Sequence, residues 1–310
     1  MYKYVLRRLL LTIPVLFGVI FIVFSIMALT PGDPGRLILG NTAKQEAVDQ
    51  LNHELGFDQP FFIRFFNYCK DIVTKFDFGK SYRTQKPVYD EIFSRFPHTL
   101  KLAISSIVFS SLLGVTLGVL SAVKQYSLFD TVSTVLAMFF AAIPAFWFGM
   151  MMIMLFALRL GWLPSSGIDS WKSFIMPTIT LTMGTAAGLL RLTRSTTLET
   201  IRQDYVRTAR AKGASERIVI FKHVLKNALM PVITMLGMSF GGLLGGAVIC
   251  ESVFAMPGLG QLILNAIRMK DIPTVMASTL FLAALFCLIM LVVDLVQAFI
   301  DPRIKAKYAK

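Results

Sequence analysis

The sequence predicts an all-α, polytopic membrane protein with about six transmembrane helices. The chain is 55% hydrophobic with a mean hydropathy of +0.66, and its apolar residues lie in long blocks. A spanning helix needs about 20 mostly apolar residues, and only helices and closed barrels satisfy their backbone hydrogen bonds in lipid. The alternating ten-residue segments of a barrel are absent from the sequence, so helices are expected.

Six apolar runs are long enough to cross a bilayer. They are 9–29, 100–123, 131–158, 174–192, 229–250 and 275–300. The first follows a basic start, as in a signal peptide. Its core is about 20 residues long, and Thr30-Pro31-Gly32-Asp33-Pro34 follows it instead of a small-residue cleavage site. We therefore predict a retained span. Pro144 lies inside the third run and should kink it.

Basic residues indicate the orientation of these spans. The formal net charge is +13, and Lys and Arg of membrane proteins collect in cytoplasmic loops. With both termini in the cytoplasm, the segments on that side hold about 16 Lys and Arg in about 61 residues, against about 13 in about 107 on the other side. We attribute the charge to topology and expect no nucleic-acid partner.

Several chemistries lack their residues in this sequence. The spans contain no series of buried carboxylates or histidines, which argues against a proton-driven carrier. No nucleophile and base pattern of an intramembrane hydrolase is present, so no catalytic residue is expected. The isolated Cys69, Cys250 and Cys287 have no CxxC spacing, and we expect no metal site. A stand-alone secondary carrier remains a remote alternative because of the glycines of the fifth run.

Small residues recur at helix-packing spacing in three runs. The pairs Gly114/Gly118 and Gly184/Gly188 fit close packing of helices within the subunit. The fifth run contains five glycines between Gly237 and Gly246, which is more than packing usually requires. We predict that this helix lines a pore or contacts another subunit.

The segment 31–98 is the long extramembrane stretch outside the cytoplasm. It contains two amphipathic patterns too short to span, the second carrying Phe62, Phe66, Cys69, Val73 and Phe76. These helices either form a lid or docking platform on the bundle or rest in the membrane interface. Gly35 to Thr42 resembles a P-loop, but Asn41 replaces the phosphate-binding Lys and no strand precedes it. We expect no nucleotide site in this chain.

The loop 194–228 is the most informative segment. We predict a basic helix over 194–212 with an apolar stripe of Leu198, Ile201, Tyr205 and Ala209, a turn at Gly213, and a second helix. Ser215 suits the N-cap of that second helix, whose apolar stripe is Ile218, Phe221, Leu225 and Ala228. A loop that only fixed topology would need neither the caps nor the stripes, so we favour a docking element.

The same loop carries a family resemblance. Asp204-Tyr205-Val206-Arg207-Thr208-Ala209-Arg210-Ala211-Lys212-Gly213 resembles the coupling loop of ABC importer permeases of the dipeptide/oligopeptide/nickel family. The acid of the superfamily's EAA motif is absent at Arg207, and a downstream Leu-Pro is replaced by Leu225-Lys226. Both departures are usual in the peptide branch.

Further motifs extend the resemblance along the chain. They are Leu29–Pro34, Asp77–Tyr82, Ile143–Trp147, Gly161–Pro164, Met176-Pro177, Glu251 with Phe254, Pro257–Gly260 and Asp301-Pro302-Arg303. The N-terminal element and the long outside segment resemble the first, or B-type, of the two permeases in such importers.

The resemblance implies a type I ABC importer permease fold in a prokaryotic plasma (inner) membrane. It implies a non-enzymatic subunit that forms half of a pathway for di- or oligopeptides, with nickel chelates or glutathione as alternatives. Expected partners are a second homologous permease, two ABC ATPases that bind ATP and magnesium, an extracytoplasmic solute-binding protein and lipid. The residues implied in ATPase coupling are Asp204, Thr208, Ala209, Lys212, Gly213, Ser215, Glu216 and Phe221. Substrate-binding residues stay unknown.

We divide the chain accordingly. Residues 1–95 hold the first span and the amphipathic outside segment, 96–300 form a five-helix core with the loop 194–228, and 301–310 are a cytoplasmic tail.

Overall fold

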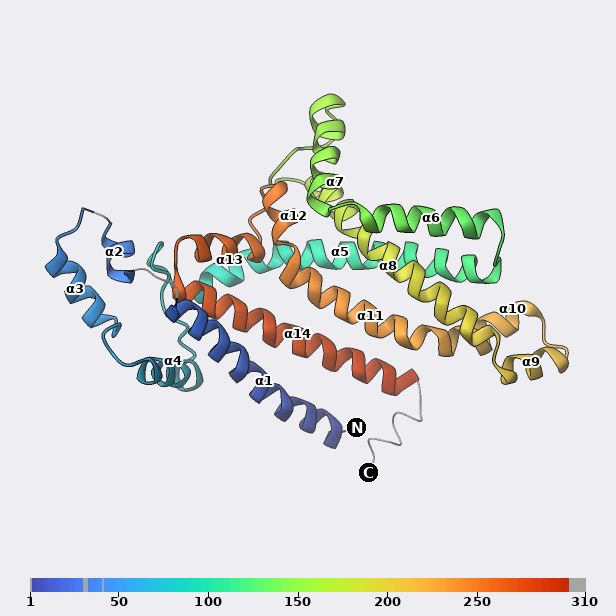
Figure 1. Cartoon of the computed structure of the whole chain (residues 1–310), viewed down its shortest axis with the longest axis horizontal. Helices are drawn as coiled ribbons and strands as arrows, with labels where there is room; N and C mark the ends of the chain where they lie inside the picture. The colour runs from blue at the N-terminus through green and yellow to red at the C-terminus, as the bar shows by residue number, and fades with distance from the viewer. Residues whose placement is uncertain (1, 30–32, 41, 301–310) are drawn as a thin grey trace. The chain divides into compact units, whose positions relative to one another are not determined.

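A computed structural model describes residues 2–29, 33–40 and 42–300, and these are almost entirely helical (Figure 1). Within them the only strand-like pairing is an isolated bridge between Lys80 and Pro87, which confirms the all-α class. The helices are α1 Tyr2–Leu29, α2 Pro34–Leu39, α3 Gln45–Glu54, α4 Phe61–Lys75, α5 Val88–Val123, α6 Leu128–Ala142, α7 Ala145–Met152, α8 Ile175–Ile201, α9 Asp204–Ala211, α10 Glu216–Ile218, α11 Leu225–Gly246, α12 Val248–Val253, α13 Leu259–Arg268 and α14 Ile272–Ile300. Short π-helical segments, Ile153–Arg159 and Val219–Val224, continue α7 and α10, and a 3₁₀ turn, Trp171–Phe174, precedes α8. The predicted tail 301–310 and Thr30-Pro31-Gly32 lie outside the described residues.

Five of the predicted spans are helices long and apolar enough to cross a membrane. The predicted third span is different, because α6 and the helix that starts at Ala145 meet at a 97° bend (Figure 1). Pro144 has no N–H to continue the helical ladder, and Ile143 before it is extended, with φ −75° and ψ 126°. The expected kink is thus a complete break, and 131–158 is not one continuous helix.

The chain divides into two compact units. Among the described residues, one contains Tyr2–Tyr4, Thr99–Met256 and Leu288–Ile300, and the other contains Val5–His98 and Pro257–Cys287. The stretch that contains α13 therefore groups with the N-terminal segment, whereas the sequence-based division separated the two at residue 95.

Close helix contacts through glycine organise the first unit. A Cβ on Gly114 would lie 2.6 Å from Leu189 Cβ, and one on Gly118 would lie 2.7 Å from Thr193 Cβ. Such distances are too short for real side chains, so α5 and α8 approach at these glycines as predicted. Gly188 differs, because its nearest neighbour is the flexible end of Met235, and Gly184 has no neighbour within 4 Å.

A buried apolar cluster lies at one end of the first unit. It consists of Leu102, Met152, Met176, Ala247, Cys250, Phe254 and Met256. It brings α5 and the end of α7 together with the start of α8 and with α12, elements far apart in sequence.

The second unit packs α1, α4, α13 and the start of α14. Phe24, Phe65 and Met276 form one buried cluster, and Val88, Ile92, Leu259, Leu262 and Ala277 form another. The P-loop-like stretch folds as helix α2, whose Gly35 N–H donates to Asn52 Oδ1 at 2.8 Å. Asp33 caps this helix by accepting from the Arg36 N–H and also accepts from Asn52, which lowers the pKa of its carboxyl.

Candidate functional site

The loop 194–228 forms a helical hairpin beyond the ends of two long helices. The helical run Glu216–Val253 contains 38 residues, about 57 Å at 1.5 Å per residue, whereas the hydrocarbon core is about 30 Å thick. One end must therefore project. Figure 1 shows α9 and α10 extending past the end of α8 and the start of α11.

The hairpin has a small core of its own. Its buried residues are Val206, Ala209, Val219, Ile220, Val224 and Ala228. Its three valines, Val206, Val219 and Val224, have no exposed surface. The loop is thus a folded element, as the matched apolar stripes predicted.

The predicted continuous helix over 194–212 is wrong. Helix α8 ends at Ile201, and Gln203 adopts an extended conformation, with φ −72° and ψ 148°, as the N-cap of α9. The chain direction changes there, so the buried face of α9 is Val206 and Ala209 and does not include Tyr205.

The turn after α9 confirms the predicted role of Gly213 as the residue that follows the helix cap. Its φ is +78°. The Ala214 N–H donates to Ala209 O at 3.3 Å and the Gly213 N–H donates to Arg210 O at 2.9 Å, the two bonds of a Schellman motif. A Cβ on Gly213 would meet no atom within 4 Å. The backbone conformation, and not crowding within this chain, favours glycine here.

An ion pair closes the same turn. Arg210 donates from Nε to Glu216 Oε1 at 2.7 Å and from Nη2 to Oε2 at 3.1 Å. This two-point contact raises the pKa of the Arg210 guanidinium. It joins the last turn of α9 to the first residue of α10 and so braces the hairpin.

Large apolar side chains remain exposed on this hairpin. Tyr205 is 43% exposed, Ile218 50% and Phe221 67%. The predicted stripe of the second helix is therefore split, because Ala228 is buried while Ile218 and Phe221 point outward. An exposed aromatic and aliphatic cluster on a rigid element is a typical anchor for a partner protein.

The eight residues predicted for coupling fall on this one element. Ala209 is buried in the hairpin core, and the other seven are exposed. Ser215 is the N-cap of α10 as predicted, although its hydroxyl accepts no capping hydrogen bond. Asp204 is the first residue of α9, and its Oδ1 lies 3.7 Å from Arg207 Nη1. Both side chains are exposed, so this ion pair contributes little to stability. The Thr208 hydroxyl donates to Asp204 O at 2.9 Å within the helix.

Sequence reasoning missed the anchor of the hairpin. Arg194 on α8 makes an ion pair with Asp130 at the start of α6, and the side chain of Asp130 is 5% exposed. Ser121 of α5 also donates to Asp130, and the Tyr126 N–H donates to Asp130 Oδ2 at 2.9 Å. Both charged residues had been assigned to loops. The position of Asp130 directly before the apolar run 131–158 was the available signal, because a carboxylate next to a membrane span usually needs a cationic partner.

A second buried carboxylate lies in the first unit. Thr99 Oγ1 donates to Glu251 Oε1 at 2.6 Å, and both residues are at most 1% exposed. In the sequence, Glu251 was singled out only as part of a family motif with Phe254. The contact ties the start of the membrane portion of α5 to α12.

Helix α11 has one packed face and one uncovered face. A Cβ on Gly237 would lie 2.2 Å from Val293 Cγ2, so this glycine allows α14 to approach. Gly242 and Gly245 have no neighbour within 4 Å. They share an exposed stripe with Met238 and Ile249, which are each 56% exposed. The sequence predicted one role, lining a pore or contacting another subunit, for all five glycines of this helix. In the structure Gly237 instead serves packing within the chain, and Gly242 and Gly245 stay free for the predicted role.

Gln297 of α14 makes an interhelical contact with α11. Its Nε2 donates to Met230 O at 3.3 Å and to Thr234 Oγ1 at 2.5 Å.

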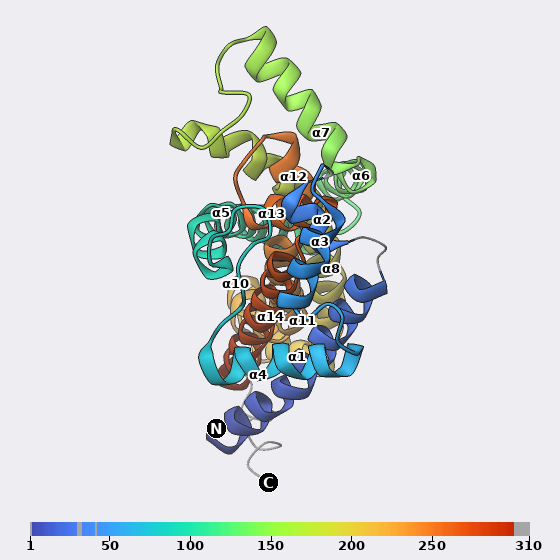
Figure 2. The same ribbon diagram turned by 90° about the vertical axis from the view of Figure 1, so that its left-hand side faces the viewer.

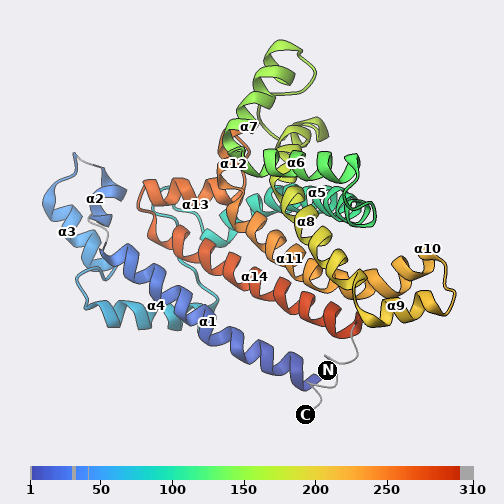
Figure 3. The same cartoon turned by 45° about the vertical axis from the view of Figure 1, so that its right-hand side comes forward.

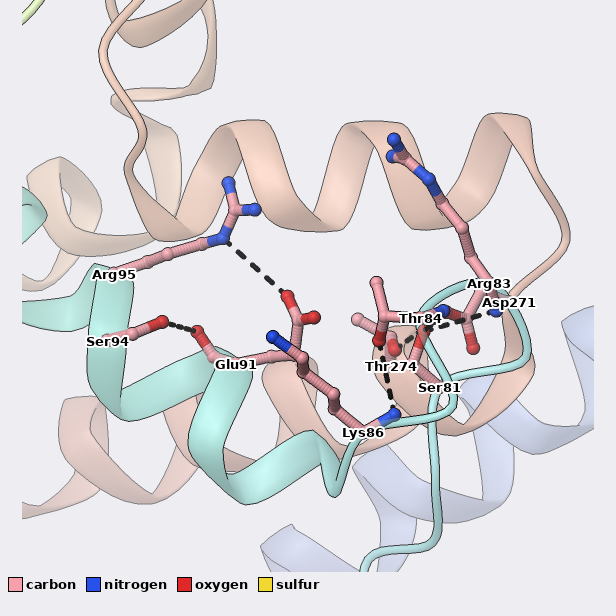
Figure 4. Close-up of polar contacts among 9 residues, drawn as sticks. All are labelled: Ser81, Arg83, Thr84, Lys86, Glu91, Ser94, Arg95, Asp271 and Thr274. Atoms are coloured by element: carbon pink, nitrogen blue, oxygen red, sulfur yellow. Dashed lines mark hydrogen bonds and ion pairs between the residues drawn. The ribbon is translucent and has the colours of Figure 1, made fainter.

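In the second unit, Asp271 organises the Asp77–Tyr82 motif (Figure 4). Its Oδ2 accepts from Ser81 Oγ at 2.5 Å and Thr274 Oγ1 at 2.9 Å, and its Oδ1 accepts from the Tyr82 N–H at 3.1 Å. This contact joins residues 190 positions apart. A polar cavity of about 100 Å³ lies beside it, lined in part by Arg83, Glu91 and Arg95.

Within the described residues, no group of three or more His, Cys, Asp or Glu is placed to hold a metal ion.

Comparisons with known proteins cover nearly the whole chain. Residues 114–306 match the family described as "Binding-protein-dependent transport system inner membrane component", and residues 1–103 match its companion "Binding-prot-dependent transport system membrane comp, N-term". The glutathione transport system permease protein GsiC of Escherichia coli (strain K12) is 43% identical over 307 residues, which are 99% of this chain and 100% of that protein. The protein of the same name from Shigella dysenteriae serotype 1 (strain Sd197) gives the same values.

Solved structures of similar fold are transporters. The MetNI methionine ABC transporter in an inward-facing conformation aligns with a TM-score of 0.57 and 25% identity, over 68% of this chain and 96% of that one. An amino acid ABC transporter crystallised with histidines aligns at 0.51 with 15% identity, over 69% and 94%, which is a likeness of fold alone.

Proposed function

Because this chain belongs to the family of binding-protein-dependent transport system inner membrane components, we propose that it forms half of the translocation pathway of an importer for glutathione or peptides of similar size. Membership makes the chain a multi-pass inner membrane protein and a non-catalytic permease subunit of an ABC importer, which works with ATPase and binding-protein partners.

The substrate proposal depends on one observation. The glutathione permeases match this chain at 43% identity along their entire length. Glutathione is a tripeptide, so it also fits the wider peptide reading of the sequence. Dipeptides, longer peptides and nickel chelates are the competing cargoes.

We propose the following assembly. A second homologous permease completes the pathway, two ABC ATPases bind ATP and magnesium, and an extracytoplasmic binding protein delivers the cargo. Both termini and the loop 194–228 lie in the cytoplasm, in keeping with the excess of Lys and Arg in those segments. The uncovered stripe of α11 with Gly242 and Gly245 faces the second permease or the pathway.

The hairpin supplies the proposed coupling. Phe221 and Ile218 would enter a groove of an ATPase, with Tyr205 beside them, while Gly213 and the Arg210–Glu216 pair keep the turn in shape. The folded core of the hairpin supports this role, since a lever must move as one body. Displacement of the hairpin would then shift α8 and α11, which leave it on either side.

Uptake by the reconstituted complex tests the proposal. The two permeases, the ATPases and the binding protein are placed in vesicles, and ATP-dependent accumulation of labelled glutathione, a dipeptide and a nickel chelate is compared. Glutathione should accumulate fastest and only with ATP. Preferential uptake of a dipeptide or a nickel chelate would replace the substrate assignment. Uptake by this chain alone, without ATPases, would contradict the coupling role.

A further inference from the structure

Helix α4 carries two adjacent apolar faces, of which only one is used inside the protein. Phe65 is 2% exposed and packs on α1. The second face consists of Phe62, Phe66 and Val73, and Cys69 lies at its border, half-buried against the cluster of Phe24, Phe65 and Met276. Phe62 and Phe66 are each 63% exposed and Val73 is 78% exposed. The sequence predicted the apolar stripe that contains Phe62 and Phe66, whereas the structure buries the adjacent face that contains Phe65.

The packed face is aromatic. Phe65 contacts Phe17 and Phe21 of α1 with ring centroids 5.4 Å apart, and Phe61 contacts Phe24 at 5.3 Å. These edge-on contacts attach α4 to the half of α1 that ends at Leu29. Phe24, Phe21 and Phe17 lie five, eight and twelve residues from that end, about 7.5, 12 and 18 Å along the helix axis.

The two helices cross steeply. Helix α4 is seen end-on in Figure 1, where α1 lies across the view, and it extends across α1 in Figure 2. A helix that crosses the outer half of a spanning helix at this angle lies along the plane of the membrane.

The exposed stripe continues the surface of the spanning helix. Phe66 contacts Phe65 at 5.9 Å, and Phe62 contacts Phe61 at 5.3 Å. The rings of α1 reached through these contacts are themselves exposed, Phe17 by 49% and Phe21 by 39%. An unbroken aromatic surface therefore runs from the side of a membrane span onto α4.

The opposite side of α4 is polar. Asn67, Asp71 and Lys75 lie there, and Lys75 Nζ is 2.8 Å from Asp71 Oδ1. Arg64 lies 4.4 Å from the ring centroid of Phe57. An apolar stripe of aromatic residues beneath a charged face is the composition of a helix that lies at a bilayer surface.

We propose that α4 is an interfacial helix, whose Phe62, Phe66 and Val73 insert among the phospholipid acyl chains next to α1. The helix fixes the depth and tilt of the first span at the end near Leu29. The alternative occupants of this stripe are the second permease and the binding protein, and the experiment distinguishes them.

Photocrosslinking in the assembled importer identifies the occupant. The photoreactive residue p-benzoylphenylalanine replaces Phe62 or Phe66 on the stripe, and Asn67 or Lys75 on the polar side as matched controls on the same helix. The complex is irradiated in phosphatidylethanolamine and phosphatidylglycerol vesicles, with and without the binding protein, and adducts are identified by mass spectrometry. Phospholipid adducts should form at 62 and 66 in several-fold excess over 67 and 75.

The proposal fails if the adducts at 62 and 66 are mainly polypeptide. It also fails if lipid adducts form equally at all four positions, or if adding the binding protein removes them at 66. None of these outcomes depends on which cargo is transported or on the coupling hairpin.

Discussion

Arg194 and Asp130 form a two-point ion pair, Nε to Oδ1 at 2.6 Å and Nη2 to Oδ2 at 2.8 Å, across 64 residues of sequence. The same carboxylate accepts from the Ser121 hydroxyl and the Tyr126 N–H. One buried acid thus holds together the end of α5, the start of α6 and the part of α8 that leads into the hairpin. Figure 3 shows the course of these helices. Movement of the hairpin would be transmitted through this contact as well as along the helices.

Breaking this pair should destabilise the protein and impair transport. Asp130→Ala leaves Arg194 without its partner, and the cost should be less than the roughly 3 kcal/mol of a fully buried pair, because the Arg194 side chain is 26% exposed. Arg194→Lys should have a smaller effect, since the ammonium keeps the charge opposite Asp130 and loses only the fork of two hydrogen bonds. Thermal unfolding of the complex and ATP-driven uptake measure both. Equal stability of Asp130→Ala and the natural protein would show that the pair has no structural weight.

Substitution at Gly213 should separate insertion from transport. We expect Gly213→Asp to abolish uptake while the protein still inserts in the membrane. A side chain costs about 1–2 kcal/mol at positive φ, and it would project into the space we assign to the ATPase. Membrane fractionation and uptake assays check the two parts, with Gly213→Ala as the smaller substitution. Normal uptake by Gly213→Asp would refute the coupling role.

Truncating Phe221 should weaken the ATPase contact without unfolding the hairpin. The side chain is 67% exposed, so Phe221→Ala removes little internal packing. A hot-spot aromatic residue at an interface costs about 2 kcal/mol or more when it is truncated, and co-purification of the ATPase should fall accordingly if Phe221 is such a residue. Val224→Ala is the matched control, because Val224 is fully buried and its truncation should lower stability first. Full retention of the ATPase by Phe221→Ala would place the interface elsewhere.

The glycines of α11 should divide into two classes. Gly237→Ala should destabilise the protein by about 1–3 kcal/mol through overpacking, since its Cβ would overlap Val293. Combining it with Val293→Ala should restore stability. Gly242→Ala should leave stability unchanged but reduce uptake if that face meets the pathway or second permease. Thermal unfolding and uptake of the three variants decide this, and a destabilised Gly242→Ala would overturn the division.

Acidification should loosen helix α2. Hydrogen bonds from Asn52 and from the Arg36 N–H lower the pKa of the Asp33 carboxyl. The stability that these bonds give to the folded helix is therefore complete above the ordinary Asp pKa of about 4. It is lost as the pH falls through the lowered pKa. Amide exchange of α2, corrected for the intrinsic rates, should be faster at about pH 3 than at about pH 6. Asp33→Asn should lack this pH dependence, because an amide caps the helix without titrating. Equal pH dependence in both proteins would assign it to another group.

Much of the architecture followed from the sequence. Apolar length located the membrane helices, and the spacing of Gly114 and Gly118 predicted their packing. Gly213 predicted the turn of the hairpin. These features are local: a span is recognised by its own length and a Schellman turn by its glycine.

Other features depended on contacts that no local pattern contains. The two stripes of α4 are equally apolar, and only the docking of Phe65 on α1 decided which stripe is buried. Proline predicted a kink in the third span, whereas a 97° break resulted. The partner of Asp130 lies 64 residues away.

The sequence alone therefore determined that this chain is a bundle of membrane helices with a folded loop between two of them. Tertiary structure decided which residues of that loop and of α4 face outward, and which charges are paired. The physical reason is that hydrophobic length and helical period act within one segment, while burial and ion pairing depend on which segment packs opposite.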